Sequence, residues 1–136
     1  MLFRSVVALE TAEVLRPGFL DLLVPGGTVL LNRLRILPQG VGPDGYPSLD
    51  RIREVLAPYR VVEFDALAEA RAIGDASGRT VNVITLGLLS TIPPFDAIDA
   101  GHWQAALAEV SPPGPGRDGN LAAFERGRLS GSGSRV

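Results

Sequence analysis

Short apolar runs alternate with helical patterns along the first half of the chain, and this alternation constrains the fold more than any other feature. We expect strands at residues 5–9, 28–32 and 60–66, because each run is continuous, apolar and too short for a buried helix. Parallel strands need long crossover connections, and the helical patterns between these runs supply them. The order of elements therefore argues for a parallel sheet covered on both faces.

The connecting segments carry their own helix signals. Residues 10–24 have helical spacing interrupted at Pro17, so we expect one helix, a second short helix and then a turn at 25–27. Ser48 is placed to cap a helix over the next eight residues. Residues 33–47 are expected to form a long irregular loop, and loops of this length in compact domains are often functional.

The remaining chain is expected to be helical. An alanine-rich helix should end at Gly74. Residues 80–91 are apolar on nearly every face, which predicts a helix buried all round. We expect Thr80 to be its N-cap and Asn82 to lie in its first turn, with the amide bonded to backbone of the 33–47 loop. Gly87 costs about 1 kcal/mol relative to alanine in a helix, so we expect another backbone to approach it closely.

Two further helices are predicted beyond residue 95. The first should start at about Asp96, and residues 111–120 should then form a loop. Asn120 is expected to cap the last helix. The apolar residues of the Asp96 helix are expected to face inward, namely Ile98, Trp103, Ala106, Leu107 and Val110.

The fold class that follows is α/β: a three-layer, Rossmann-like parallel sheet with helices on both faces and a helical C-terminal third. We expect a single domain over residues 1–129. The segment SGSGSRV has the composition of a linker, so residues 130–136 are expected to be a flexible tail.

The composition excludes several kinds of chemistry. The chain has no cysteine, so it cannot ligate an iron–sulfur cluster or use a thiol nucleophile. All 13 basic residues are arginine, which excludes Schiff-base chemistry, and a multi-histidine metal site is impossible because His102 is the single histidine. A net charge of −2 without a basic stripe argues against nucleic acid. No apolar run reaches the length of about 20 residues that a membrane span needs, so we expect a cytoplasmic protein.

A nucleotide site at the first strand is disfavoured. The strand leads into ETAEV, without the G-x-G-x-x-G sequence that cradles a diphosphate. Glu10 and Glu13 would repel a phosphate there and are better explained as acidic residues at a helix N-terminus than as an acid–base pair. Arg33 and Arg35 follow the second strand and are either solvated or bind an anion at the carboxyl edge of the sheet. Tyr46 is either an interface anchor or a packed turn residue.

Four segments together resemble the gamma subunit, or gamma domain, of 2-oxoacid:ferredoxin oxidoreductases, in the variant found as the beta subunit of indolepyruvate oxidoreductase. They are VALETAEVLRPGFLDLLVPGGTVLLN, GYPSLDRIREVL, RTVNVITLGLL and NLAAFERGR, and their order and spacing agree over residues 5–128. Members of the family begin with a further glycine-rich strand–turn–helix, so the chain resembles an N-terminally truncated fragment. The residues that match the family motifs, and are candidates for subunit contacts, are Glu10, Glu13, Asn32, Tyr46, Asn82, Gly87, Asn120 and Phe124.

The resemblance implies a subunit of a heteromeric enzyme that oxidatively decarboxylates indolepyruvate, another aryl pyruvate or pyruvate to acyl-CoA. It implies no catalytic, cofactor-binding or metal-binding residue in this chain. Thiamine diphosphate and iron–sulfur clusters would lie on partner subunits, and coenzyme A and ferredoxin would act through the complex. Two alternatives stay open: an independent nucleotide- or small-molecule-binding Rossmann-like domain, and a purely structural interaction module.

Overall fold

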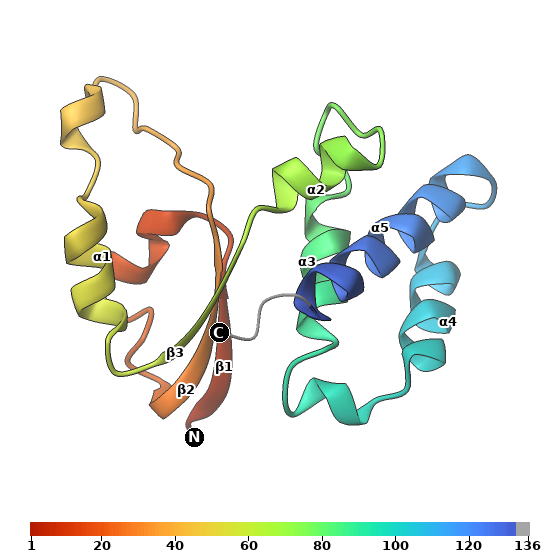
Figure 1. Ribbon diagram of the computed structural model, residues 1–136, viewed down its shortest axis with the longest axis horizontal. Coiled ribbons are helices and arrows are strands. Elements are labelled where there is room, and N and C mark those ends of the chain that lie inside the picture. The colour runs from red at the N-terminus through yellow and green to blue at the C-terminus, as the bar shows by residue number, and fades with distance from the viewer. Residues whose placement is uncertain (133–136) are drawn as a thin grey trace. The chain divides into compact units, whose positions relative to one another are not determined.

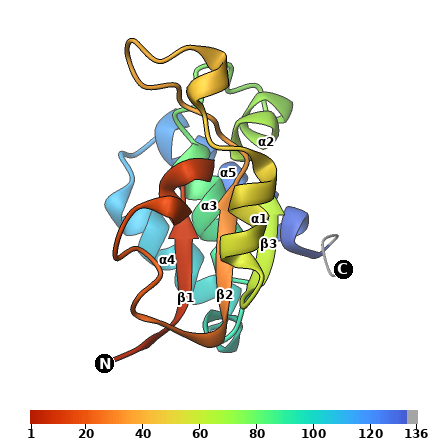
Figure 2. The same ribbon diagram turned by 90° about the vertical axis from the view of Figure 1, so that its left-hand side faces the viewer.

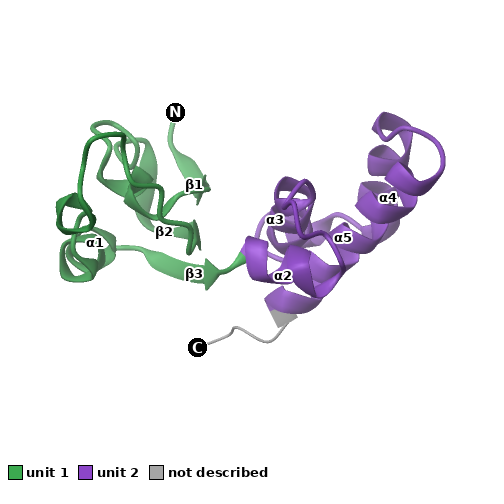
Figure 3. Ribbon diagram, turned by 90° about the horizontal axis from the view of Figure 1, so that it is seen from above, with its two compact units in different colours: residues 1–65 green, residues 66–136 purple. Residues whose placement is uncertain are grey.

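The protein, seen here in a computed structural model that describes residues 1–132, divides into two compact units, residues 1–65 and residues 66–136 (Figure 3). A parallel sheet forms the centre of the first unit, and the second unit is helical. The α/β class and the helical C-terminal part are therefore confirmed, although the helical part covers half of the chain rather than a third. A single domain over 1–129 and helices on both faces of the sheet stay predictions.

The three predicted strands are present and lie in sequence order. They are β1 (Phe3–Ala8), β2 (Leu23–Asn32) and β3 (Arg60–Phe64), all parallel (Figure 2). Right-handed crossovers that run in one direction across a sheet place both connections on the same face. The 3₁₀ helix η1 (Thr11–Leu15) and α1 (Leu49–Leu56) do lie together on one face of this sheet (Figure 1).

The core of the first unit lies between this sheet face and α1. Side chains alternate along a strand, so Val29 and Leu31 of β2 point to the same face and meet Ile52 and Leu56, one helical turn apart on α1. The predicted cap is confirmed: the Ser48 hydroxyl oxygen accepts a hydrogen bond of 3.2 Å from the Arg51 N–H.

Two local predictions in the first unit are wrong. The glycine pair at 26–27 is part of β2 and not a turn before it; the pairing register shifts between Phe3 and Ser5, and Gly26 takes φ +72°, so the extra residues form a bulge. No second helix follows Pro17. Arg16 is extended, the conformation favoured before proline, and turns lead from there into β2.

The second unit consists of α2 (Ala66–Ala72), α3 (Val81–Leu89), the 3₁₀ helix η3 (Phe95–Ala97), α4 (Ala100–Val110) and α5 (Pro115–Ser132). Helix α3 packs against α2 and α5, and α4 packs against α5 (Figure 1). Gly74 follows α2 with φ +89°, which confirms the predicted helix stop. Among the described residues, no helix is long and apolar enough to cross a membrane.

A close crossing of α3 and α5 explains the glycine within the apolar helix. A Cβ at Gly87 would lie 2.0 Å from the carbonyl oxygen of Phe124, and a Cβ at Gly127 would lie 1.9 Å from the carbonyl oxygen of Ile84. Each helix therefore needs a glycine where the other backbone passes. The predicted backbone approach at Gly87 is confirmed.

The start of α3 differs from the expected cap. Thr80 occupies the N-cap position, but its side chain makes no capping bond. Its N–H and its hydroxyl instead donate to the Asp75 carboxylate, at 2.7 and 2.8 Å. Asn82 lies in the first turn as predicted, but its side chain is exposed, so burial does not explain this amide. The predicted bond from Asn82 to the 33–47 loop would join the two units and stays a prediction.

The two predicted C-terminal helices have different bounds from those expected. Helix α4 begins at Ala100, because the Asp99 carboxylate accepts a hydrogen bond of 2.8 Å from the Gly101 N–H. Of the residues expected to face inward, Leu107 is buried and Trp103 half-buried, while Ile98, Ala106 and Val110 are exposed.

Helix α5 starts five residues before the predicted cap. Pro115 begins it, since proline is preorganised for a first helical position. Residues 115–120 are therefore helical rather than loop, and Asn120 is not an N-cap; its amide donates to the Ser111 hydroxyl at 2.9 Å. The helix continues to Ser132 through the start of the expected tail, and residues 133–136 lie outside the described residues.

Candidate functional site

Polar residues from three separate segments meet where the parallel strands of the first unit end. Glu10 follows β1, Asn32 ends β2, and Tyr46 closes the long loop that follows β2. Ligands of open parallel sheets bind near this carboxyl edge, because the connecting loops leave the sheet there. This edge is therefore the place to look for function.

The Glu10 carboxylate is the centre of this cluster. One oxygen accepts a hydrogen bond of 2.9 Å from the Ala12 N–H, which caps η1. The other oxygen accepts from the Ile36 N–H at 3.1 Å and from the Tyr46 hydroxyl. The carboxylate thus accepts three hydrogen bonds. Glu10 joins the end of β1 to both ends of the 33–47 loop.

Asn32 and Thr11 hold the neighbouring strand end. The Asn32 side chain is almost fully buried, and its amide donates to the Leu9 carbonyl at 3.0 Å. The Thr11 hydroxyl donates to the Asn32 carbonyl at 3.1 Å, and the Thr11 N–H donates to the Leu34 carbonyl at 2.8 Å. Backbone N–H and C=O groups at the ends of β1 and β2 have no partner in the sheet, and these hydrogen bonds satisfy them.

Tyr46 is packed rather than exposed, with 7% of its surface accessible. Burial raises the pKa of its phenol to about 12, and the Glu10 carboxylate adds to this shift by accepting the hydroxyl proton and by its charge. The Arg35 guanidinium lies over the ring, 4.4 Å from its centroid. Of the two interpretations offered by the sequence, the packed turn residue is confirmed within the first unit.

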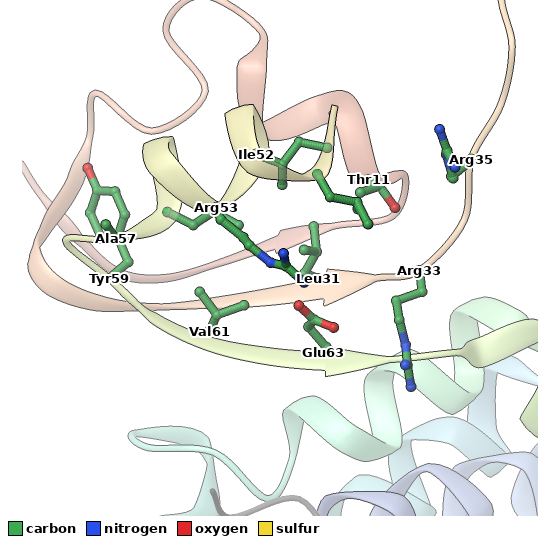
Figure 4. Close-up of a pocket in the computed structure, with 12 residues that line it drawn as sticks. Thr11, Leu31, Arg33, Arg35, Ile52, Arg53, Ala57, Tyr59, Val61 and Glu63 are labelled. Carbon is green, nitrogen blue, oxygen red and sulfur yellow. The ribbon is translucent and has the colours of Figure 1, made fainter. Parts of the chain in front are cut away.

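A cavity of about 620 Å³ lies beside this cluster, between α1 and the sheet (Figure 4). Its apolar surface comes from both layers: Leu31 and Val61 project from the strands, and Ile52 and Leu56 project from α1. Every residue that lines the cavity belongs to the first unit. The cavity therefore belongs to this unit alone.

Four charged residues line the same cavity, and three of them are arginines. Arg53 extends from α1 toward Glu63 on β3, and Arg33 and Arg35 lie near the end of β2 (Figure 4). Among the described residues neither Arg33 nor Arg35 forms an ion pair. The cavity therefore combines an apolar wall with a lining that includes three arginines and one glutamate.

The other predicted site residues lie elsewhere. Glu13 is on η1, where it pairs with Arg16 at the surface. Gly87 and Phe124 meet at the α3–α5 crossing in the second unit, where Phe124 is fully buried. Asn82 is exposed on α3, and Asn120 on α5 donates a hydrogen bond to Ser111, so neither joins Gly87 and Phe124 in these contacts. The structure thus brings Glu10, Asn32 and Tyr46 together in one cluster and Gly87 and Phe124 in another.

No metal-binding cluster occurs among the residues that the structure describes. The sequence has no cysteine, and residues 1–132 contain no group of three or more acidic or histidine side chains that could hold a metal ion. His102 is exposed at the start of α4.

The sequence did not identify Arg53 and Glu63 as site residues. On α1, Arg53 belongs to an alternating charged pattern that is typical of a solvated helix face, and Glu63 interrupts an apolar strand. Val61 and Glu63 are two residues apart and therefore share one face of β3. A charged residue on the same strand face as an apolar one was the signal in the sequence that could have pointed to Glu63.

No protein-family model matches the sequence, and no curated protein matches it.

Proposed function

We propose that this chain is a non-catalytic subunit of a 2-oxoacid:ferredoxin oxidoreductase. The enzyme would oxidise indolepyruvate, another aryl pyruvate or pyruvate to the corresponding acyl-CoA. Thiamine diphosphate and iron–sulfur clusters would be carried by partner subunits, and ferredoxin and coenzyme A would react through the complex. The proposal places the complex in the cytoplasm and extends the resemblance of the four sequence segments.

One observation carries the proposal: five of the eight residues that match the family motifs meet in space, in two clusters. Glu10, Asn32 and Tyr46 come from segments up to 36 residues apart and join one hydrogen-bonded cluster. Gly87 and Phe124 come from the other two segments and are in backbone contact. If the four segments matched the family by chance, we would not expect the matching residues to contact one another in the structure.

The chemistry of the chain favours the role of a non-catalytic subunit. The Glu10 carboxylate accepts three structural hydrogen bonds, and Glu13 pairs with Arg16. A chain without cysteine cannot hold the clusters that pass electrons to ferredoxin. Catalysis would therefore depend on the thiamine-diphosphate-binding subunit, and this chain would contribute binding surface.

Co-expression tests the proposal directly. The chain, carrying an affinity tag, is expressed with the thiamine-diphosphate-binding oxidoreductase subunit encoded in the same genome. We expect the two to purify together in fixed stoichiometry, and we expect coenzyme A-dependent reduction of a viologen dye by indolepyruvate or pyruvate to need both. Separate elution of the two chains, with dye reduction unchanged when this chain is omitted, would refute the proposal.

The cavity beside α1 favours one second candidate, an independent small-molecule-binding domain. A nicotinamide or flavin dinucleotide fits this candidate poorly, because Glu10 occupies the turn where a diphosphate would bind. Thermal shift measurements with these cofactors separate the two candidates. A clear rise in melting temperature with either cofactor would favour the independent domain.

A further inference from the structure

We infer that the cavity between α1 and the sheet is a binding site for a small organic anion with an apolar body. This inference is independent of the oxidoreductase proposal, because it concerns a ligand bound by the first unit itself. It rests on the size of the cavity, its position, its two-sided lining and its charge.

Size and position point to a small molecule. Ligand pockets usually enclose about 300–1,000 Å³, and this cavity encloses about 620 Å³. Thr11, Arg33 and Glu63 line it where β1, β2 and β3 end. The cavity thus reaches the carboxyl edge of the sheet, where ligands bind in open α/β folds, and extends along α1 to Ala57 and Tyr59, which precede β3 (Figure 4).

The apolar wall would hold the body of the ligand. Leu31, Ile52 and Leu56 are each less than 5% exposed, so the wall is part of a packed core and keeps its shape without a ligand. A preformed wall costs little ordering on binding. An aliphatic or aromatic body would contact this wall and be removed from water.

The charges determine the sign of the ligand. Three arginines and one glutamate, Glu63, are among the residues that line the cavity; the Arg53 side chain extends into it, whereas the Arg33 side chain points away from α1 (Figure 4). Arg53 has one ionic partner, Asp50 at 3.6 Å, and both side chains are largely exposed, so this pair is weak and can be exchanged. A carboxylate, sulfonate or phosphate on the ligand would find arginine donors suited to planar or tetrahedral anions.

Two matched dyes test the inference on the full chain. The anionic probe is 8-anilino-1-naphthalenesulfonate, and N-phenyl-1-naphthylamine has the same ring system without the sulfonate. We expect one anionic dye to bind per chain by calorimetry, about tenfold more tightly than the neutral dye. No saturable binding of the anionic dye, or equal affinity for both dyes, would overturn the inference.

Charge variants locate the bound dye. Arg53→Gln should weaken binding of the sulfonate about tenfold and leave the neutral dye unchanged, because one guanidinium is lost. Glu63→Gln should strengthen sulfonate binding about threefold, since a like charge is removed. Arg51→Gln is the matched control: Arg51 is on the same helix, pairs with Glu54 and does not line the cavity. Equal effects of the two arginine variants would refute the assignment.

A filled cavity gives a second, independent readout. Ala57 is exposed and lines the rim, so Ala57→Trp can place an indole in the opening without altering the core. We expect both dyes to lose at least about tenfold in affinity. Unchanged binding of the sulfonate would mean that it binds elsewhere on the chain, and the inference would be wrong.

Discussion

The crossing of α3 and α5 predicts opposite effects for the same substitution at two helical glycines. Gly87→Ala places a methyl group 2.0 Å from the Phe124 carbonyl oxygen, whereas Cβ atoms stay at least 3.0 Å from other atoms, so the helices must separate by about 1 Å or more. Overpacking costs about 1–3 kcal/mol, and the upper end applies because backbone cannot move aside as a side chain can. Alanine returns about 1 kcal/mol of helix propensity. We expect a net loss of about 2 kcal/mol in the free energy of unfolding.

Gly119→Ala on α5 is the control. A Cβ at Gly119 meets no atom within 4 Å, so only the helix propensity changes, and we expect a gain of about 1 kcal/mol. Urea unfolding can be followed through Trp103, the single tryptophan, whose ring lies 6.3 Å from that of Phe124 in this unit. For an m-value of about 2 kcal/mol per molar urea, the Gly87 variant should lower the midpoint by about 1 M.

Gly127, the glycine of α5 at the same crossing, provides a test that could refute this interpretation. Gly127→Ala meets the Ile84 carbonyl and forces the same separation of the same two helices. The double variant should therefore cost less than the two single variants added together, by about 1 kcal/mol or more. Strict additivity, or a Gly87 variant as stable as the Gly119 variant, would show that the two backbones do not lie in contact.

Three further predictions concern polar clusters. Tyr46→Phe removes the hydrogen bond to Glu10 and should lower stability by about 1.5–3 kcal/mol, measured by urea unfolding; an unchanged midpoint would mean that the bond contributes nothing. The pKa of Tyr46 is raised to about 12, so the stability that this phenol contributes is fully present below pH 10 and lost as the pH rises toward 12. Absorbance at 295 nm should show that Tyr46 deprotonates late, and deprotonation of Tyr46 near pH 10 would contradict this prediction. Hydrogen bonds from Ser77 and Thr80 lower the pKa of Asp75, so its contribution is present above about pH 4 and lost at lower pH. Asp75→Asn should destabilise the second unit at pH 7 and flatten the acid limb of its stability curve, and an acid limb identical to that of the wild type would argue against this role.

The candidate site was predictable in part. The sequence identified Glu10, Asn32 and Tyr46 as motif residues, and Arg33 and Arg35 as candidates at the sheet edge. It gave no reason to join Glu10 to Tyr46, because a hydrogen bond between residues 36 positions apart depends on the path of the 33–47 loop. The sequence also could not predict the cavity, because a cavity is the space that neighbouring elements leave unfilled. Arg53 and Glu63 can be recognised as lining residues only once α1 is known to lie over β3.

Local chemistry determined the order and type of most elements. Apolar runs at strand length specify β1, β2 and β3, Ser48 specifies the start of α1, and Gly74 specifies the end of α2, because these signals act within a few residues. The same signals gave a wrong helix start where two start signals lie close together. Asn120 has the side chain of a cap, but Pro115 begins the helix before it.

The tertiary structure decided which residues meet. The sequence predicted that a backbone approaches Gly87, but the identity of that backbone follows from the crossing of α3 with α5, where Gly127 supplies the matching space. It likewise left Arg33 and Arg35 as either solvated or anion-binding, without indicating the cavity that they line. Propensity and capping are properties of neighbours along the chain, whereas close approach and the lining of a cavity are properties of neighbours in space, which packing alone brings together.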